Sequence, residues 1–166
     1  MKKLLMVLLM VMACIGSASA FIDKYTLNRE DLPEEARSFL NEHFPWAKVS
    51  MIKVDRHLLK KTDYNVKLVN GTKIEFNPKG KWTSIDCKKR SVPEALVTKP
   101  IRKYLDKNYA GNKVVKLRKK ISGYEVGLCD GQELKFSLIG GFTGKKTQAE
   151  IEADNQDDND EEEENS

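Results

Sequence analysis

Residues 64–76 read YNVKLVNGTKIEF, and residues 124–136 read YEVGLCDGQELKF. In both stretches, apolar and polar side chains alternate on either side of an Asn-Gly or Asp-Gly pair. Alternation with a period of two is typical of a half-buried strand, and these pairs favour a tight hairpin whose two central positions need positive φ. The stretches align without a gap at an offset of 60 residues. The sequence therefore predicts one hairpin that occurs twice.

A helix is predicted before each hairpin. Its apolar stripe recurs at helical spacing in both places, at an offset of 65 residues. The matched positions are Ala36, Phe39, Leu40 and Phe44 in the first helix and Ile101, Tyr104, Leu105 and Tyr109 in the second. Pro33 and Pro100 stand near the two helix starts, where proline is favoured. Further strands are predicted over residues 49–54, 81–85 and 114–119.

These elements predict an α+β fold made of two tandem repeats. The repeats span residues 21–91 and 92–147, and each is a helix packed on an antiparallel meander of three or four strands. The helix would cover one face of its sheet and leave the other face in solvent. A unit of about 60 residues is marginal as a stable domain. We therefore expect the halves to share one continuous sheet or to place two sheets against each other.

The N-terminus has the pattern of an export signal. Lys2 and Lys3 precede an apolar stretch over residues 4–15, and Ala18-Ser19-Ala20 supplies small residues for cleavage. Residues 1–20 are therefore predicted to be a signal peptide of a periplasmic or secreted protein. The alternative is a lipoprotein signal with lipidation at Cys14, the only case in which we expect membrane attachment.

Cleavage would leave two cysteines, Cys87 and Cys129. In an oxidising compartment the two thiols are a candidate disulfide, but sequence does not show that they lie close enough to pair. The alternative, two unpaired and partly buried thiols, is favoured. No CxxC or HxxxH spacing is present, so no metal site is expected.

Charge divides the chain into a basic core and an acidic tail. Residues 21–147 hold 27 Lys and Arg against 15 Asp and Glu, a net charge of +12. Residues 148–166 hold ten carboxylates and no basic residue, so the overall charge of +4 conceals the division. A run of like charges with almost nothing to bury is predicted to be disordered.

Three roles for this tail remain open. It could serve only to keep the protein soluble, which is the favoured reading. It could fold back over a basic face of the core and compete with an acidic partner. It could also bind calcium through residues 157–164, but only weakly, because the glycine turn and ligand spacing of an EF-hand are missing.

The sequence offers no catalytic constellation. The two histidines, His43 and His57, share no spacing with each other or with a nucleophile, and no GxSxG, HExxH, SxxK, P-loop or GxGxxG motif is present. We expect both histidines at the surface or at the rim of the core, no cofactor and no enzymatic activity.

Strand alternation selects the candidate binding residues. Side chains that point away from the helices would form a charged face, basic in the first half and mixed in the second. Trp46 has no aromatic counterpart in the second half and is a candidate anchor. The candidate partner-binding residues are Trp46, Lys67, Lys73, Glu75, Glu125 and Lys135. Nucleic acid is not expected as a partner, because no aromatic stacking positions lie among the basic residues.

The repeated pattern resembles the PepSY-like family, whose members are also described as β-lactamase-inhibitor-like. The resemblance rests on Leu32 to Leu40, Phe44-Pro45 and Tyr64 to Phe76, and on the matching residues of the second half, Val92-Pro93 and Tyr124 to Phe136. It covers roughly residues 28–143 and implies tandem helix-plus-sheet units in a secreted protein without known enzymatic chemistry. Ala110 departs from the pattern, since Pro45 stands at this place in the first half, and the acidic tail lies outside it.

Together these features predict an exported, monomeric, non-enzymatic binding module. It would act as an inhibitor of, or an adaptor for, an unknown protein or peptide in the cell envelope, through its open sheet face. The alternative is an envelope-associated structural factor, similar to a lipoprotein, that binds anionic surface polymers.

Overall fold

The computed structural model describes residues 24–55 and 62–163. The strands in these ranges are β1 (Lys24–Thr26), β2 (Val49–Asp55), β3 (Asp63–Leu68), β4 (Lys73–Phe76), β5 (Trp82–Asp86), β6 (Val114–Lys120), β7 (Gly123–Leu128), β8 (Glu133–Ser137) and β9 (Phe142–Lys145). The helices are α2 (Glu34–His43), α3 (Lys99–Asn108) and α4 (Gln148–Glu163), with 3-10 helices η1 (Arg29–Asp31) and η2 (Glu94–Leu96). The predicted signal peptide, Cys14 and His57 lie outside the described residues.

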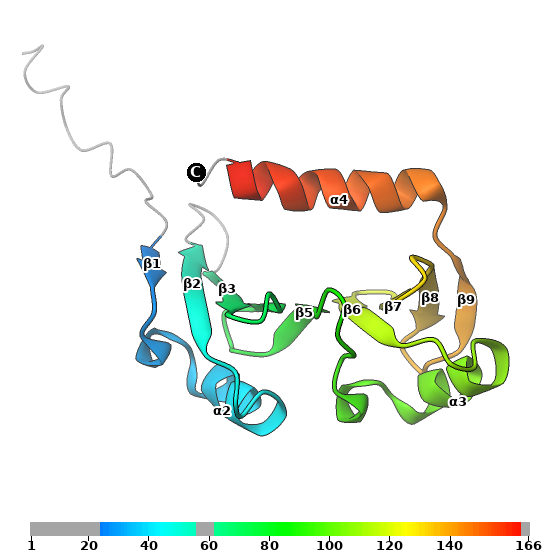
Figure 1. Cartoon of the computed structure of the whole chain (residues 1–166), viewed down its shortest axis with the longest axis horizontal. Helices are drawn as coiled ribbons and strands as arrows, with labels where there is room; N and C mark the ends of the chain where they lie inside the picture. Colours follow the sequence, from blue (N-terminus) through cyan, green and yellow to red (C-terminus); the bar gives the residue numbers. More distant parts are fainter. Residues whose placement is uncertain (1–23, 56–61, 164–166) are drawn as a thin grey trace, which may run out of the picture.

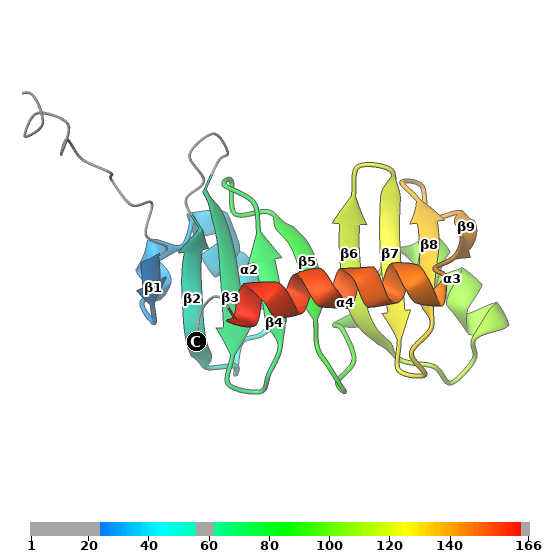
Figure 2. The ribbon, with the colours of Figure 1, turned by 90° about the horizontal axis from the view of Figure 1, so that it is seen from above.

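The strands form one antiparallel sheet in the order β1 to β9, so that each strand pairs with its neighbour in sequence (Figures 1 and 2). The α+β class is confirmed. Between continuous and abutting sheets, the structure has the continuous one, because β5 pairs with β6 and places Ile85 opposite Leu117. No helix in the described part of the chain is both long and apolar enough to cross a bilayer.

Both predicted hairpins form, and they have the same register. Tyr64 lies opposite Phe76 in β3 and β4, and Tyr124 lies opposite Phe136 in β7 and β8. The expected turn type is wrong. Gly71 and Gly131 each have φ +86°, but among the described residues other than glycine only Lys88 has positive φ.

The turns are three-residue loops with a glycine in the left-handed position. In the first, the N–H of Leu68 donates to the carbonyl of Thr72. The side chain of Asn70 accepts a hydrogen bond from the N–H of Thr72 at 3.0 Å. In this conformation the asparagine closes the turn through its side chain and does not need positive φ itself.

The hydrophobic core lies between the sheet and helices α2 and α3, which cover the same face of the sheet (Figure 1). Ala36 and Leu40 of α2 are buried there, as are Ile101 and Leu105 of α3. The strands contribute Ile52, Val54, Val66, Leu68, Ile74, Phe76, Ile85, Leu117, Val126, Leu128, Leu134 and Phe136. The spacing that predicted the helices is therefore the spacing of the side chains that they bury.

An aromatic contact fixes each helix to its hairpin. Phe39 of α2 meets Phe76 edge to face at a centroid distance of 5.6 Å. Tyr104 of α3 meets Phe136 in the same way at 5.4 Å and stacks on Phe142 at 4.6 Å. These edge and stacked geometries are favourable for aromatic pairs and set the distance of each helix from the sheet.

The predicted disorder of the tail is wrong for residues 148–163, which form α4. This helix runs across the other face of the sheet, from β8 towards β3 and β4 (Figure 2). The prediction treated the carboxylates as a charge run with no partner, whereas the sheet supplies cations on the face that the helix covers. That face, opposite α2 and α3, is called the outer face below. It was expected to lie in solvent, and α4 covers part of it.

The candidate disulfide does not form. Cys87 and Cys129 are both free thiols, the first buried and the second exposed. Burial raises the pKa of the Cys87 thiol, with the Asp86 carboxylate adding to the shift and a hydrogen bond with Thr72 opposing it. The unpaired alternative is the one that the structure has.

We expect Gly80→Ala to destabilise the fold more than Gly71→Ala. Both glycines have positive φ, where an alanine costs about 1–2 kcal/mol. A Cβ at position 80 would lie 2.8 Å from the backbone nitrogen of Ala36 in α2, but a Cβ at position 71 would meet nothing within 4 Å. Overpacking should add about 1–3 kcal/mol at Gly80 alone. Chemical denaturation of both variants measures the difference, and equal losses would contradict close packing of this turn on α2.

Candidate binding face

The outer face of the second half carries charges of alternating sign. Across one row of paired residues, Arg118 of β6 lies opposite Glu125 of β7, which lies opposite Lys135 of β8. Opposite charges at directly facing positions stabilise neighbouring strands. The row is therefore a property of the strand register and does not depend on α4.

A second row contains a glycine that lets two charges approach each other. Lys116 lies opposite Gly127, which lies opposite Glu133. The Lys116 ammonium reaches the Glu133 carboxylate at 3.7 Å across this position. A Cβ on Gly127 would lie 2.8 Å from the Cβ of Lys116, so the small residue keeps the contact open.

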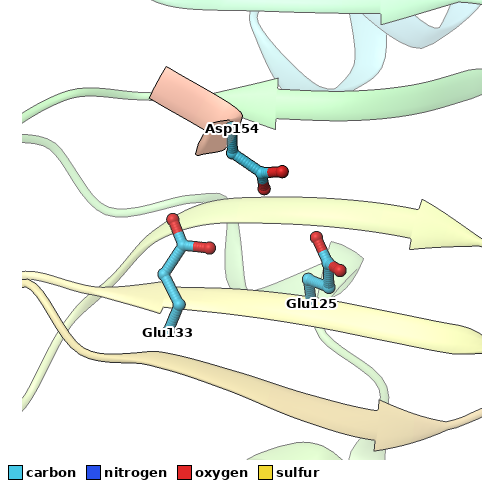
Figure 3. Close-up of side chains that lie close together, drawn as sticks. All are labelled: Glu125, Glu133 and Asp154. Atoms are coloured by element: carbon cyan, nitrogen blue, oxygen red, sulfur yellow. The ribbon is translucent and has the colours of Figure 1, made fainter. Parts of the chain in front are cut away.

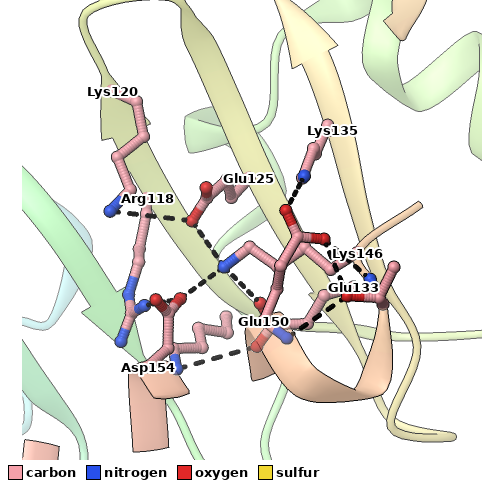
Figure 4. A network of polar contacts seen from close by, with 10 residues as sticks. Arg118, Lys120, Glu125, Glu133, Lys135, Lys146, Glu150 and Asp154 are labelled. Atoms are coloured by element: carbon pink, nitrogen blue, oxygen red, sulfur yellow. Dashed lines mark hydrogen bonds and ion pairs between the residues drawn. The ribbon is translucent and has the colours of Figure 1, made fainter. Parts of the chain in front are cut away.

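Lys146 lies at the centre of the charged face (Figure 4). Its backbone N–H donates to the carbonyl of Glu133, and its side chain is only 4% exposed. The ammonium lies 2.9 Å from Oε2 of Glu125 and 3.0 Å from Oε2 of Glu133, and it also donates to Asp154 of α4. Burial alone would lower the pKa of Lys146, but the bonds with the three carboxylates outweigh it and raise the pKa above its usual value.

Helix α4 begins with a capping box. The hydroxyl of Thr147 accepts a hydrogen bond from the N–H of Glu150 at 3.3 Å, and the Glu150 carboxylate accepts one from the N–H of Thr147 at 2.8 Å. Such a reciprocal pair satisfies two backbone donors at a helix start. The same carboxylate meets the Lys135 ammonium at 2.5 Å. The Lys135 contact, with the Thr147 bonds, lowers the pKa of Glu150 to about 2.

One turn further along α4, Asp154 makes the second contact with the sheet. It accepts a hydrogen bond from Arg118 Nη1 at 2.6 Å and another from Lys146. Burial opposes ionisation of Asp154, but the Lys146 bond and the charges of Arg118 and Lys120 lower its pKa. Helix α4 is thus fixed to the outer face by two carboxylates that are four residues apart.

Three carboxylates of this network converge, as Figure 3 shows. One oxygen each from Glu125, Glu133 and Asp154 lies within 4.8 Å of the others. Oxygens in this arrangement could hold a hard cation. The Lys146 ammonium contacts all three groups and supplies the positive charge. Lys116, Arg118 and Lys120 each contact one of the three carboxylates as well, so the cluster is balanced by the chain's own cations.

The structure brings together two of the six predicted binding residues, Glu125 and Lys135. Three others lie on the outer face of the first half: Lys67 and Lys73 are directly opposite each other, and Glu75 is exposed. Helix α4 passes over this half of the sheet (Figure 2). Trp46 is 95% exposed, but it follows α2 and so belongs to the opposite layer.

Arg118, Lys146, Glu150 and Asp154 were missed as functional candidates. Alternation in β6 could have found Arg118, and the Thr-x-x-Glu pattern of Thr147 and Glu150 could have found the helix start. Nothing in the local sequence marks Lys146, because it follows the last strand. His43 packs against Phe39 at a centroid distance of 4.7 Å, as a side chain at the rim of the core.

We expect α4 to leave the sheet as the pH falls. The docked pKa of Glu150, about 2, is below its ordinary 4.5, and that of Asp154 is below its ordinary 3.8. Depressed carboxyl pKa values stabilise the docked state above roughly pH 4.5, and this stabilisation is lost as the pH falls towards 2. Amide chemical shifts of residues 150–154 should move with pH and with added salt while those of β7 stay constant. Shifts that remain constant in acid would contradict docking by ion pairs.

We expect Lys146→Met to be one of the most damaging single changes on the outer face. It would leave Glu133 and Glu125 buried together with only the longer contacts of Lys116 at 3.7 Å and Lys120 at 3.9 Å, a loss of about 3–5 kcal/mol. Lys135→Met is the matched control, because its 35% exposed ion pair should contribute no more than about 1 kcal/mol. Chemical denaturation measures the free energy of unfolding of both variants. Equal losses would show that Lys146 contributes no more than an exposed ion pair does.

Comparison with known proteins agrees with this fold. Residues 62–143 match the family model "Putative beta-lactamase-inhibitor-like, PepSY-like". The match ends before Lys146 and α4, which therefore lie outside the family model. No curated protein is similar enough to this chain to count as a match.

Three solved structures of similar chains come from Bacteroides species. One, a "putative periplasmic protein of unknown function" from Bacteroides vulgatus, is 40% identical with a TM-score of 0.73, over 76% of this chain and 100% of that chain. A "putative calcium-regulated periplasmic protein" from Bacteroides thetaiotaomicron is 36% identical with a TM-score of 0.71, over 75% of this chain and 97% of that one. A third, a "putative periplasmic protein from DUF2874 family" of B. vulgatus, is 36% identical with a TM-score of 0.71, over 77% of this chain and 99% of that one.

These relatives are described as periplasmic, which supports a periplasmic location, and none of the descriptions indicates a catalytic activity. The family match and the relatives above 30% identity together establish the relationship. The chain belongs to the PepSY-like family.

Proposed function

We propose that the chain is an exported, non-catalytic binding module whose outer sheet face recognises an acidic segment of a protein or peptide in the cell envelope. The observation that carries this proposal is that the chain's own acidic helix, α4, occupies the cationic positions of that face through ion pairs. Cleavage after Ala20 would release the mature protein into the periplasm.

The contact between α4 and the sheet is of a kind that another acidic segment could replace. Ile151 is the one large apolar residue of the helix, so little hydrophobic area holds it in place. Ion pairs at a protein surface typically contribute about 0–1 kcal/mol each. The attachment is thus moderate and sensitive to salt, as expected for a segment that exchanges with a partner.

A duplicated unit would explain how one chain makes a long outer face. In support, α2 precedes β2 to β5 and α3 precedes β6 to β9, and the two hairpins have the same register. Lys67 and Lys73 would then extend the cationic surface of the second half into the first. Trp46, on the opposite layer, would be a separate anchor.

We expect the full-length chain carrying Glu150→Gln and Asp154→Asn to bind poly-L-glutamate, a generic acidic polypeptide, at low salt. Adding Arg118→Gln and Lys135→Gln should weaken this binding at least about tenfold, because two of the cations that contact α4 are then neutral. Isothermal titration calorimetry measures both.

The matched control for this experiment adds Lys103→Gln and Lys107→Gln instead. These exposed lysines lie on α3, on the other side of the sheet (Figure 1), and remove the same charge. If both variants lose binding equally, the binding depends on the net charge of the protein and not on the outer face, which would contradict the proposal.

The second candidate function is an envelope-associated factor that holds anionic polymers and is anchored by lipid at Cys14. The residues before Cys14 favour it, since a small alanine directly precedes the cysteine. Mass spectrometry of the mature N-terminus separates the two: Phe21 supports the soluble module, and an acylated Cys14 supports the anchored factor. Binding to heparin with equal strength to poly-L-glutamate would also favour the polymer-holding role.

A response to calcium is named in the description of one relative. In this chain the converging carboxylates of Glu125, Glu133 and Asp154 support such a response, and the Lys146 ammonium among them opposes it. The Lys146→Met variant decides between these readings. Stabilisation of the variant, but not of the natural chain, by added calcium would show that lysine replaces the ion here.

A further inference from the structure

We propose that the outer face recognises a helix with two carboxylates four residues apart, and that α4 is the chain's resident copy of that ligand. This inference rests on the proposed function and names its ligand class. The partner would be a protein that presents such an acidic helix, and α4 would have to leave before the partner could bind.

Two cationic positions on the sheet receive the two carboxylates. Lys135 on β8 meets Glu150, and Arg118 on β6 together with Lys146 meets Asp154. Residues four apart lie on the same side of a helix, separated by about 6 Å along its axis. The cations come from strands two apart, whose backbones are about 9–10 Å from each other, and their long side chains converge on the two carboxylates of one helical turn.

Two of the cations on the sheet are more buried than the carboxylates of the helix that contact them. The side chains of Arg118 and Lys146 are 11% and 4% exposed, whereas Asp154 and Glu150 are 26% and 46% exposed. Glu125 and Glu133 orient the Lys146 ammonium from the sheet, independently of α4. Preorganised groups on one side and half-exposed groups on the other are what a receptor and an exchangeable ligand would show.

An extended peptide with its carboxylates four residues apart would not satisfy both positions. In a strand, residues four apart are separated by about 13 Å, roughly twice the helical distance. Helix α4 also crosses several strands and does not run along one of them (Figure 2). The geometry therefore favours a helix laid across the face over a strand added to the sheet edge.

The tether gives α4 an advantage over any partner. The helix begins directly after Thr147, close to the sheet, and a short tether corresponds to an effective concentration in the millimolar range. A partner helix of equal intrinsic affinity at micromolar concentration would bind little. Weakening α4 should therefore raise the apparent affinity for a ligand supplied in trans.

The test uses a labelled synthetic peptide of residues 147–156, in which Glu150 and Asp154 are the one pair of carboxylates four residues apart, added to the full-length chain. We expect it to bind the Glu150→Gln, Asp154→Asn chain at least about tenfold more tightly than the natural chain, because the resident helix no longer competes. Fluorescence anisotropy measures both affinities. In this variant Lys146, the most buried of the cations that contact α4, keeps Glu125 and Glu133 as partners.

Two peptide variants test spacing and helicity. The first carries Asp154→Asn with Asn155→Asp, which keeps the net charge but leaves no two carboxylates four residues apart. The second carries Ala153→Pro, which keeps both carboxylates and breaks the helix. Each peptide should bind the chain that carries Glu150→Gln and Asp154→Asn, called the weakened chain, at least about tenfold less tightly than the natural peptide does.

Equal binding of the three peptides would overturn the helical ligand, while binding of poly-L-glutamate would leave the proposed function standing. Failure of the natural peptide to bind the weakened chain, although poly-L-glutamate binds, would overturn the inference in the same way. Loss of poly-L-glutamate binding as well would overturn both.

Discussion

The pairing of β5 with β6 is the constraint on which the rest of the molecule depends. Ile85 and Leu117 face each other across it, and both are fully buried. Without this pairing, each half would be a small unit with limited core and no continuous outer face. The same pairing places Ser84 beside Arg118 and so aligns the charge row that continues through Glu125 and Lys135.

Charge neutrality on the outer face is built in two layers. Within the sheet, carboxylates and cations alternate across the strands, and Lys146 is held between Glu125 and Glu133. Helix α4 adds Glu150 and Asp154 from outside, at positions where the sheet still offers cations. The inner layer needs burial and hydrogen bonds to be stable, whereas the outer layer needs only proximity and low salt. This division lets one layer exchange while the other stays in place.

Periodic features of the sequence were sufficient for most of the fold. The alternation around Tyr64 and Tyr124 and the stripes of α2 and α3 reflect burial, which local patterns report directly. Strand β1 was not predicted, because its three residues are mostly exposed and are too few to show an alternation of apolar and polar side chains. The turn type was wrong because the side chain of Asn70 closes the loop, which the Asn-Gly pair alone does not distinguish from a two-residue turn.

The binding face was harder to predict, because its parts come from distant elements. Glu125 and Lys135 follow from strand alternation, but their partners lie in a segment that composition alone marks as disordered. The helix forms there because Thr147 and Glu150 cap its start and because cations of the sheet offset its charge. A composition argument counts charges within a segment and so misses compensation from a surface that only the folded chain creates.

Both ends of the long sheet are short strands. Strand β1 has three residues, and β9 has four, including Gly144 and the exposed Lys145. A short edge with a lysine offers few unpaired backbone groups to a second molecule. An open sheet of this width could otherwise extend from copy to copy into fibrils. The short edge strands limit such polymerisation at high protein concentration. Binding is then left to the face of the sheet.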